Sequence, residues 1–461
     1  MSCSTENKAR KWQRRKEYLR RAHQHNHSGL LSEPKGTRAP ATSPKACEIA
    51  HAPSQPCIKV HICTFNSCGT VPCGDDLDRL LPTPRPDILA IGLSEFGMSL
   101  EKTLINKRTL RVLSRNWAAE VQQRLGADQF TLAASRQLQG LLLVVFARVD
   151  LPYCPLAVKT DAVATGAGNV VGNKGAVIVK LFLSAQQSAD SDGQQHSIKV
   201  DPNLHKRVSS TTKDPHQASL TFVHCHLAAH PRNTKRRNQD YERILTTSRL
   251  LQHVSRHRPS KSRNHRPRPA RHHHHHTTKR RSRVGVFRRF QKLYRRREKD
   301  TFRDTRGPVF LFGDLNFRVQ CGNRAYCDRL LAMGRFDELL HKRCQLTRQL
   351  LHNDDSDDSQ GSKESLGEIE TVSRAPPWSE WKEAPVFFPP TYKFDMGTSV
   401  YDTSDKQRIP SWTDRILWRS DADGLHQINC QAYDSIPSVK SSDHRPVYAS
   451  FDIRLGSTDG I

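Results

Sequence analysis

Short apolar runs separated by polar residues recur along most of the chain. They are rich in β-branched and aromatic side chains, which is typical of strands in buried sheets. The runs span residues 58–66, 87–95, 140–149, 175–183, 219–227, 309–316, 415–418 and 446–453. Helical periodicity lies between them, at residues 116–125, 238–254 and 323–333. This alternation predicts an α/β fold in which helices cover the sheets.

Several segments lack any apolar periodicity. Residues 1–55 are rich in Lys, Arg, His, Pro and Ser, so we expect a basic disordered tail with one basic helix around residues 10–23. Polar inserts are expected at about 184–217, 255–305 and 351–375, of which the second is strongly basic and the third is acidic and Ser-rich. Residues 456–461 are expected to form a short tail.

Charge and composition narrow the class of partner. The 461-residue chain is 36% hydrophobic, which is low for a compact domain, and its formal net charge is +27. A strongly basic chain favours nucleic acid, an acidic membrane surface or phosphorylated metabolites, and charge alone does not choose among them. No apolar stretch is long enough to span a bilayer, and the first residues lack a secretory signal. We therefore expect a cytoplasmic protein.

The cysteines and a histidine run suggest metal binding only weakly. Twelve cysteines are scattered without a CxxC pair, which is typical of reduced thiols in the cytosol. Cys63, Cys68 and Cys73 form a spaced series, but no matching His/Cys cluster at zinc spacing follows it. The run of histidines at 272–276 is interpreted as part of a solvated low-complexity tract.

Several apolar runs end on side chains suited to metal or proton chemistry. These side chains are Asn66, Glu95, His226, Asp314 and Asn316, with Asp443 and His444 just before the last run. One polar strand end is ordinary, but several of these types together indicate a shared site at one edge of the sheets. Glu95 and Asn66 offer the oxygen ligands that Mg²⁺ prefers. His226 and His444 can donate to phosphate oxygens.

A second set of candidates is cationic. Its members are Lys174 in a Gly-flanked loop, Tyr392 and Lys393 in "PPTYKFD", and Lys406, Arg408 and Arg415 in "DKQRIPSWTDRILW". Basic side chains spread over three loops suit a ligand that bears several phosphates. For any single lysine, ordinary surface charge is the simpler interpretation.

The order of the motifs resembles that of the inositol polyphosphate 5-phosphatases, within the endonuclease/exonuclease/phosphatase superfamily. The matching stretches, between residues 57 and 455, are "TFN", "DILAIGLSE", "TGAGNVVGNKGAV", "HCHLAAH", "RRNQDYERIL", "FLFGDLNFR", "FPPTYKFD", "YDTSDKQRIPSWTDRILW" and "SDHRPV". "GDLNFR" together with "PSWTDRIL" is the most specific combination. Other stretches resemble the subgroup that contains the skeletal-muscle-and-kidney-enriched and the proline-rich enzymes.

This resemblance implies a fold and an activity. The fold would be a four-layer α/β sandwich of two packed mixed β-sheets flanked by helices, as in DNase I, formed by a catalytic domain at residues 56–455. The activity would be Mg²⁺-dependent hydrolysis of the 5-phosphate of phosphoinositides (phosphatidylinositol 4,5-bisphosphate or 3,4,5-trisphosphate) and/or of soluble inositol polyphosphates. The protein would act in the cytoplasm, peripherally at membranes, and its oligomeric state is not indicated.

The resemblance also implies catalytic roles. Asn66, Glu95 and Asp443 would form the metal set. Asp314 would orient and deprotonate the attacking water, with Asn316 beside it.

The scissile phosphate and its neighbour would be bound by the remaining candidates. His444 and His226 would contact the scissile phosphate, while Asp414 fixes the tautomer of His444 and favours its charged form. The 4-phosphate contacts would be Tyr392, Lys393, Lys406 and Arg408. Lys174 would face ring or phosphate groups, and Arg415 completes the cationic set.

Four positions depart from the pattern of the family. Ser94 stands where the family usually has Gln, Phe65 where it has Trp, and His224 where it has Asn; residues 343–346 replace a "DQL" element. Ser94 would loosen the support around the metal ligand, and His224 adds an imidazole near the site. No proposed catalytic group is lost, so we predict an active enzyme.

Two other interpretations remain open. A nuclease of the same superfamily would share the Asn/Glu, "GDLN" and "SDH" skeleton, and the positive charge would suit DNA. Against it, "PPTYK" and "DKQRIPSWTDR" resemble inositol-phosphate contacts, so nucleic acid is not the expected partner. A catalytically weak adaptor would bind anionic membranes through its basic tracts. The insert at 255–300 is a candidate membrane contact, a solvated linker or, through residues 279–283, a nuclear localisation signal.

Overall fold

The computed structural model describes the strands and most of the helices that the sequence predicts. The described residues are 57–98, 107–151, 153–166, 173–185, 217–251, 307–351, 378–420 and 426–455. The tails predicted at 1–55 and 456–461, and most of the three predicted inserts, lie outside these residues. Within them, no helix has the length and apolar character needed to cross a membrane.

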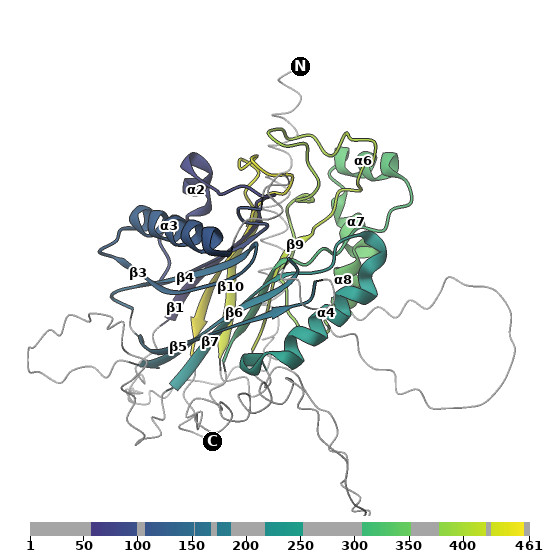
Figure 1. The fold of residues 1–461 in the computed structure, drawn as a ribbon. Coiled ribbons are helices and arrows are strands. Elements are labelled where there is room, and N and C mark those ends of the chain that lie inside the picture. The colour runs from purple at the N-terminus through teal and green to yellow at the C-terminus, as the bar shows by residue number, and fades with distance from the viewer. Residues whose placement is uncertain are drawn as a thin grey trace, which may run out of the picture.

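A six-stranded mixed sheet forms one half of the molecule (Figure 1). Its strand order is β10-β11-β1-β2-β4-β3. Only β1 and β2 are parallel neighbours, and the other pairs are antiparallel. The strands are β1 (Cys57–Asn66), β2 (Ile88–Ser94), β3 (Phe130–Leu138), β4 (Leu141–Arg148), β10 (Gln427–Ser435) and β11 (Val447–Arg454).

A five-stranded mixed sheet forms the other half, in the order β5-β6-β7-β8-β9. Here β7 and β8 are the parallel pair. The strands are β5 (Tyr153–Ala164), β6 (Gly175–Ala185), β7 (Gln217–His226), β8 (Val309–Asp314) and β9 (Asp414–Arg419). Every apolar run predicted from the sequence is therefore a strand.

Helices cover the outer faces of both sheets, so the predicted four-layer α/β sandwich is confirmed (Figure 1). Helix α3 packs on β3 and β4, and helix α4 packs on β5 and β6. Helices α6, α7 and α8 lie on the same side of the molecule as α4. The helices are α2 (Gly74–Leu80), α3 (Lys107–Leu125), α4 (Thr234–Thr247), α6 (Arg324–Ala332), α7 (Phe336–Arg343) and α8 (Gln345–Leu350), with short 3₁₀ turns at Pro231–Asn233 and Arg249–Leu251.

Strand alternation decides which side chains enter the space between the sheets. On β2, Leu89, Ile91 and Leu93 join the apolar cluster under α3, so the alternate positions, which include Gly92 and Ser94, face the second sheet. Aliphatic side chains and aromatic rings fill the space between the sheets. The rings of Phe310 and Phe451, for example, lie 5.0 Å apart across it. Toward the edge where β1, β2, β7 and β8 end, buried polar side chains, among them Ser94, His224 and His226, take their place.

Candidate active site

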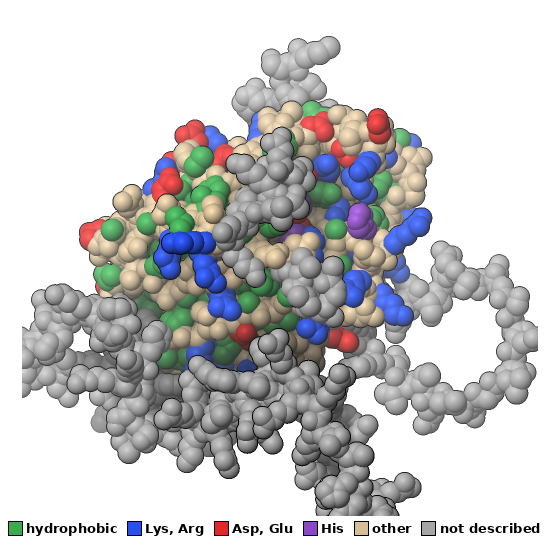
Figure 2. Space-filling view, viewed as in Figure 1, with side chains coloured by type: hydrophobic (Ala, Val, Ile, Leu, Met, Phe, Trp, Pro, Cys, Tyr) green, Lys and Arg blue, Asp and Glu red, His purple; other side chains and the backbone are tan. Residues whose placement is uncertain are grey.

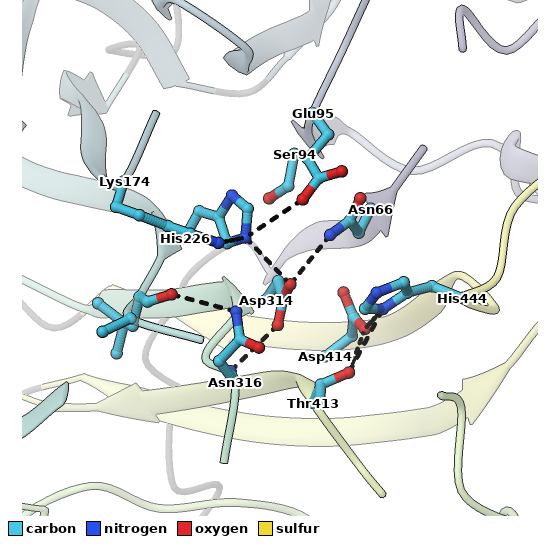
Figure 3. A network of polar contacts seen from close by, with 12 residues as sticks. Asn66, Ser94, Glu95, Lys174, His226, Asp314, Asn316, Thr413, Asp414 and His444 are labelled. Atoms are coloured by element: carbon cyan, nitrogen blue, oxygen red, sulfur yellow. Dashed lines mark hydrogen bonds and ion pairs between the residues drawn. The ribbon is translucent and has the colours of Figure 1, made fainter. Parts of the chain in front are cut away.

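Four strand ends meet at one edge of the sandwich and carry the central part of the predicted site (Figure 3). Asn66 ends β1, Glu95 directly follows β2, His226 ends β7 and Asp314 ends β8. The parallel registers place Asn66 opposite Ser94 and His226 opposite Asp314. Because parallel strands end at the same edge of a sheet, each sheet brings two of these groups together.

Asp314 lies at the centre of this group. Its Oδ2 accepts a hydrogen bond from Asn66 Nδ2 at 3.0 Å and lies 3.2 Å from His226 Nε2, while its Oδ1 accepts from the Asn316 N–H at 3.1 Å. Burial alone would raise the pKa of the Asp314 carboxyl. The hydrogen bond and charge of His226, with other nearby cations, instead hold that pKa well below its usual range. Asp314 is therefore ionised at neutral pH.

His444 and Asp414 form a second buried pair beside Asp314. The Nδ1 of His444 lies 2.7 Å from Asp414 Oδ2, which also accepts from the Thr413 hydroxyl at 3.0 Å. Burial lowers the pKa of His444, but the charge and hydrogen bond of Asp414 outweigh this effect and raise the pKa to about 10. His444 is therefore an imidazolium at neutral pH. Its Nε2 can donate to an anionic ligand.

Arg318 is a site residue to which the sequence analysis assigned no role. It donates from Nη2 to Asn316 Oδ1 at 2.5 Å, and its guanidinium lies 4.4 Å from the centre of the Tyr392 ring. Asn316 has a φ of 57° and donates from its amide to the Leu227 carbonyl at 3.1 Å. The guanidinium of Arg318 therefore fixes the orientation of the Asn316 side chain. The sequence contained a signal for this role, because Arg318 is the last residue of the "GDLNFR" motif.

Glu95 and Asn66 fit a hard cation. The Glu95 side chain is 42% exposed, and its Oε1 lies 3.8 Å from His226 Nε2. Asn66 Oδ1 accepts from the Cys68 N–H at 3.1 Å and retains a second lone pair. No group of three or more His, Cys, Asp or Glu in the described ranges could hold a metal by itself. The pair still suits Mg²⁺, which takes one or two carboxylates and completes its shell with water and substrate phosphates.

Asp443, which was predicted as a metal ligand, lies among cations. Its Oδ2 is 3.8 Å from Lys393 Nζ and its Oδ1 is 3.9 Å from His444 Nε2. In this position its charge also helps to raise the pKa of His444.

Lys174 adds a cation on the opposite side of Asp314. Its ammonium contacts His226 Nε2 (Figure 3), and burial lowers the pKa of Lys174. A cation that is desolvated at this position can bind an anionic ligand strongly, because little water has to be displaced.

The other predicted cations lie on two adjoining segments. Tyr392 forms a β-bridge with His444, and their rings lie 4.4 Å apart. The Lys393 carbonyl accepts from the Asp402 N–H at 2.9 Å. Asp402 in turn accepts from the Arg408 N–H at 2.8 Å, so it ties Lys393 to the loop that carries the exposed Lys406. Further Lys and Arg side chains gather over α4, α6 and α7 on the face seen in Figure 2.

The structure does not bring Arg415 to this site. Arg415 follows Asp414 on β9, and adjacent strand residues point to opposite faces. Its guanidinium is fully buried, where it forms an ion pair with Glu383 and contacts Cys344 Sγ and Thr347 Oγ1 at 3.4 Å. The charge of Arg415 is therefore compensated within the fold, which indicates a structural role.

Replacing Arg415 with methionine is expected to lower the free energy of unfolding by about 3–5 kcal/mol, because the carboxylate of Glu383 would stay buried without its partner. Urea denaturation at pH 7 measures this loss. The double variant Arg415→Met/Glu383→Leu should recover most of it. Equal destabilisation of the single and the double variant would contradict the assignment.

All nine cysteines whose side chains the structure describes are free thiols, as the sequence analysis predicts. Cys63, Cys68 and Cys73 belong to no metal-ligating cluster within the described residues.

Comparisons with known proteins agree with this geometry. A profile described as endonuclease/exonuclease/phosphatase family 2 matches residues 63–190 and 206–450. The chain is 26% identical to phosphatidylinositol 4,5-bisphosphate 5-phosphatase A of Rattus norvegicus, over 92% of this chain and 34% of that protein. It is 25% identical to inositol polyphosphate 5-phosphatase K of Mus musculus, over 88% of this chain and 68% of that protein. The resemblance stated from the motifs is therefore confirmed.

A solved structure supports the fold. The inositol polyphosphate 5-phosphatase domain of SpSynaptojanin, in complex with inositol 1,4-bisphosphate and a calcium ion, superposes with a TM-score of 0.54 at 23% identity, over 87% of each chain. The chain spans about a third of the length of the first curated relatives, 34% and 32%.

Proposed function

This chain belongs to endonuclease/exonuclease/phosphatase family 2, and from that premise we propose that it is a Mg²⁺-dependent inositol polyphosphate 5-phosphatase. Its substrates would be phosphoinositides, soluble inositol polyphosphates, or both, and it would act in the cytoplasm at membrane surfaces. The observation that carries the proposal is the pairing of a buried, ionised Asp314 with a cationic His444 at the edge where both sheets end. This pairing provides an acceptor for a water molecule beside a donor for a phosphate.

Asn66 and Glu95 would hold the Mg²⁺, which when bound supplies positive charge against the phosphate oxygens. Asp314 accepts a hydrogen bond from the attacking water and takes its proton as the new P–O bond forms and the ester P–O bond breaks. The released inositol oxygen then takes up a proton through solvent, and Asp314 returns to its carboxylate form. Its low pKa makes Asp314 a better orienting group than a strong base. Asn316 and Arg318 keep its carboxylate in place.

His444 and His226 would neutralise the scissile phosphate. His444 donates from Nε2 while Asp414 keeps the ring charged and oriented through Nδ1. Lys174 and His226 lie together on the other side of Asp314. Phosphoryl transfer depends mainly on positioning and on neutralising oxygen charge, so no residue needs to become phosphorylated.

Selection of a substrate with a neighbouring phosphate would fall to the segments around residues 392–408. Tyr392 packs on His444, so a group bound by Lys393 lies next to the scissile phosphate. Lys406 and Arg408 extend the cationic surface from there through the loop that Asp402 holds. Contacts of this kind suit a ring that carries adjacent phosphates.

A panel of four substrates tests the function, each with Mg²⁺ and with EDTA. The substrates are inositol 1,4,5-trisphosphate, inositol 1,4-bisphosphate, phosphatidylinositol 4,5-bisphosphate in vesicles, and an abasic oligonucleotide. We expect Mg²⁺-dependent phosphate release only from the two that carry a 5-phosphate. The vesicle arm also compares lipid with soluble substrate.

Other results would redirect the assignment. Incision of the oligonucleotide without phosphate release from the inositol substrates would place the chain among the nucleases. If none of the four substrates reacts but the protein binds the vesicles, the membrane-binding adaptor would be favoured. The basic insert at 255–300, which is the candidate membrane contact, lies outside the described residues.

A further inference from the structure

The candidate active site is divided between the two sheets. The six-stranded sheet supplies Asn66 and Glu95, and the five-stranded sheet supplies His226 and Asp314. The Asn66–Asp314 bond of 3.0 Å and the His226–Glu95 contact of 3.8 Å join the two halves. All four of these side chains are proposed to contact metal, water or phosphate, so these contacts change partners when ligands bind. A contact between the two sheets whose residues bind no ligand would keep the two halves of the site aligned.

A contact of this kind, between Ser94 and His224, is buried between the sheets next to the site. Ser94 Oγ lies 3.3 Å from His224 Nε2, and neither residue has any exposed surface. Ser94 comes immediately before Glu95 in the chain. His224 lies two residues before His226, so both imidazoles leave the same face of β7. The contact between Ser94 and His224 therefore connects the backbones of both halves without using a group that reaches solvent.

The fold provides a space for the His224 ring. A Cβ at Gly92 would lie 2.3 Å from Nδ1 and 2.6 Å from Cγ of that ring. The Phe312 ring adjoins the same space: its centre lies 5.5 Å from that of the His224 ring, and its Cε2 would lie 2.8 Å from the same Cβ. Since real Cβ contacts are never this short, the glycine on β2 is what lets the imidazole enter between the sheets.

The ring is neutral under working conditions. Burial lowers the pKa of His224 to about 3, an effect that the charge of His226 reinforces and the Leu93 carbonyl and Asp314 oppose. Its Nδ1 has no hydrogen-bond partner in the described part of the chain. The contact with Ser94 Oγ is made by the other ring nitrogen, Nε2. A neutral anchor adds no charge that would compete with His226 for the phosphate.

Ser94 is also linked through a backbone hydrogen bond to the segment that carries Asn66, the second proposed metal ligand. Its carbonyl accepts from the Ser67 N–H at 2.9 Å, which fixes the turn directly after Asn66. A shift of Ser94 would thus move both Glu95 and Asn66.

We propose that Ser94 and His224 are positioning residues that hold the metal-binding half of the site in register with the phosphate-binding half. The proposal rests on the proposed function, because it takes Asn66 and Glu95 as metal ligands. It assigns to these two residues no contact with substrate or metal.

The test compares Ser94→Ala, His224→Leu, their double variant and His224→Gln. Mn²⁺ affinity without substrate, followed by electron paramagnetic resonance, is the first measurement; kcat and KM for inositol 1,4,5-trisphosphate are the second. Removing a partner behind a metal ligand typically costs about 10–100-fold in affinity or activity. We expect a loss of that size in Mn²⁺ affinity and kcat for each single variant, with KM for the substrate changing less.

Two further variants report on the contact itself. The double variant should lose no more than about threefold beyond the worse single variant, because both changes remove the same contact. His224→Gln should recover most of the loss, since its amide nitrogen can reach the position of Nε2. Ser94→Ala removes only a hydroxyl, so the test stands even if His224→Leu fails to fold.

The chain offers a matched control. His61 is also buried and lies 2.8 Å through Nδ1 from the Ser450 hydroxyl, within the six-stranded sheet and away from the site. His61→Leu should lower the thermal midpoint and leave Mn²⁺ affinity unchanged. Mn²⁺ affinity within about twofold of wild type in Ser94→Ala, or an equal loss of affinity in His61→Leu, would overturn the inference.

The two proposals can fail separately. A wild-type protein that binds Mn²⁺ but releases no phosphate would refute the phosphatase activity alone, and the Mn²⁺ series would still decide the positioning role. A wild-type protein that releases phosphate but binds no Mn²⁺ would overturn the positioning role alone.

Discussion

Replacing Asp314 with asparagine is expected to reduce phosphate release on the order of 10²–10⁴-fold. The substitution keeps the shape of the side chain but removes the acceptor that orients and deprotonates water. It also places an uncharged group among the cations that now surround Asp314, so the positions of His226 and Lys174 are expected to shift. Single-turnover assays with inositol 1,4,5-trisphosphate measure the loss at the chemical step.

Asp161→Asn is a suitable control for this loss. Asp161 is a half-buried carboxylate on β5 that accepts from the Ser248 hydroxyl at 2.8 Å, away from the strand ends of the site. Its substitution should leave the rate of phosphate release near that of the wild type. If Asp314→Asn retained a tenth or more of the wild-type rate, the role of Asp314 in activating water would be wrong.

Replacing Asp414 with asparagine is expected to lower the rate on the order of 10⁴-fold at pH 8, a loss of the size seen when the carboxylate behind a catalytic histidine is replaced by an amide in a serine-protease triad. In the folded protein the pKa of His444 is about 10, against an ordinary value of 6.5. The pairing therefore contributes stability that is fully present below pH 6.5 and is lost as the pH rises through about 10. If catalysis needs the imidazolium form of His444, activity should likewise fall as the pH rises through about 10.

The pH profile of kcat/KM separates this effect from a general loss of structure, because it reports the pKa values of the free enzyme. The wild-type profile should stay flat on its alkaline side to about pH 10. In Asp414→Asn burial acts on His444 without its main compensating charge, so the alkaline limb should move to below pH 7. Nuclear magnetic resonance of the His444 ring gives the same pKa directly. An unchanged alkaline limb would show that the cationic form of His444 is not required.

Much of the fold follows from local pattern. The apolar runs that became β1, β2, β4, β6, β7, β8 and β9 are nearly continuous in burial, and short β-branched runs of this kind have few alternatives to a buried strand. The run that became β11 alternates between buried and half-buried positions, which is the pattern of a strand with one face in the core. Strand β10 was missed because most of its side chains are half-buried or exposed, and β3 was missed for a similar reason. Helices α7 and α8 were missed because each is too short for periodicity to stand out.

The sequence by itself determined the residue types at the strand ends and, through their order, the family. Asn66, Glu95, His226 and Asp314 could be grouped from the sequence because each ends an apolar run with a side chain suited to metal or proton chemistry. The pairing of His444 with Asp414 followed from the resemblance of the motifs.

Only the tertiary structure decided which of these groups face one another. Arg415 belongs to the same motif as Lys406 and Arg408, yet its side chain lies on the opposite face of β9 from that of Asp414 and pairs with Glu383. Ser94 and His224 were noted as two separate departures from the family pattern, 130 residues apart, and prove to be partners across the sandwich. The physical reason is that local patterns fix the period of a strand, whereas the packing of two sheets fixes which inward positions meet.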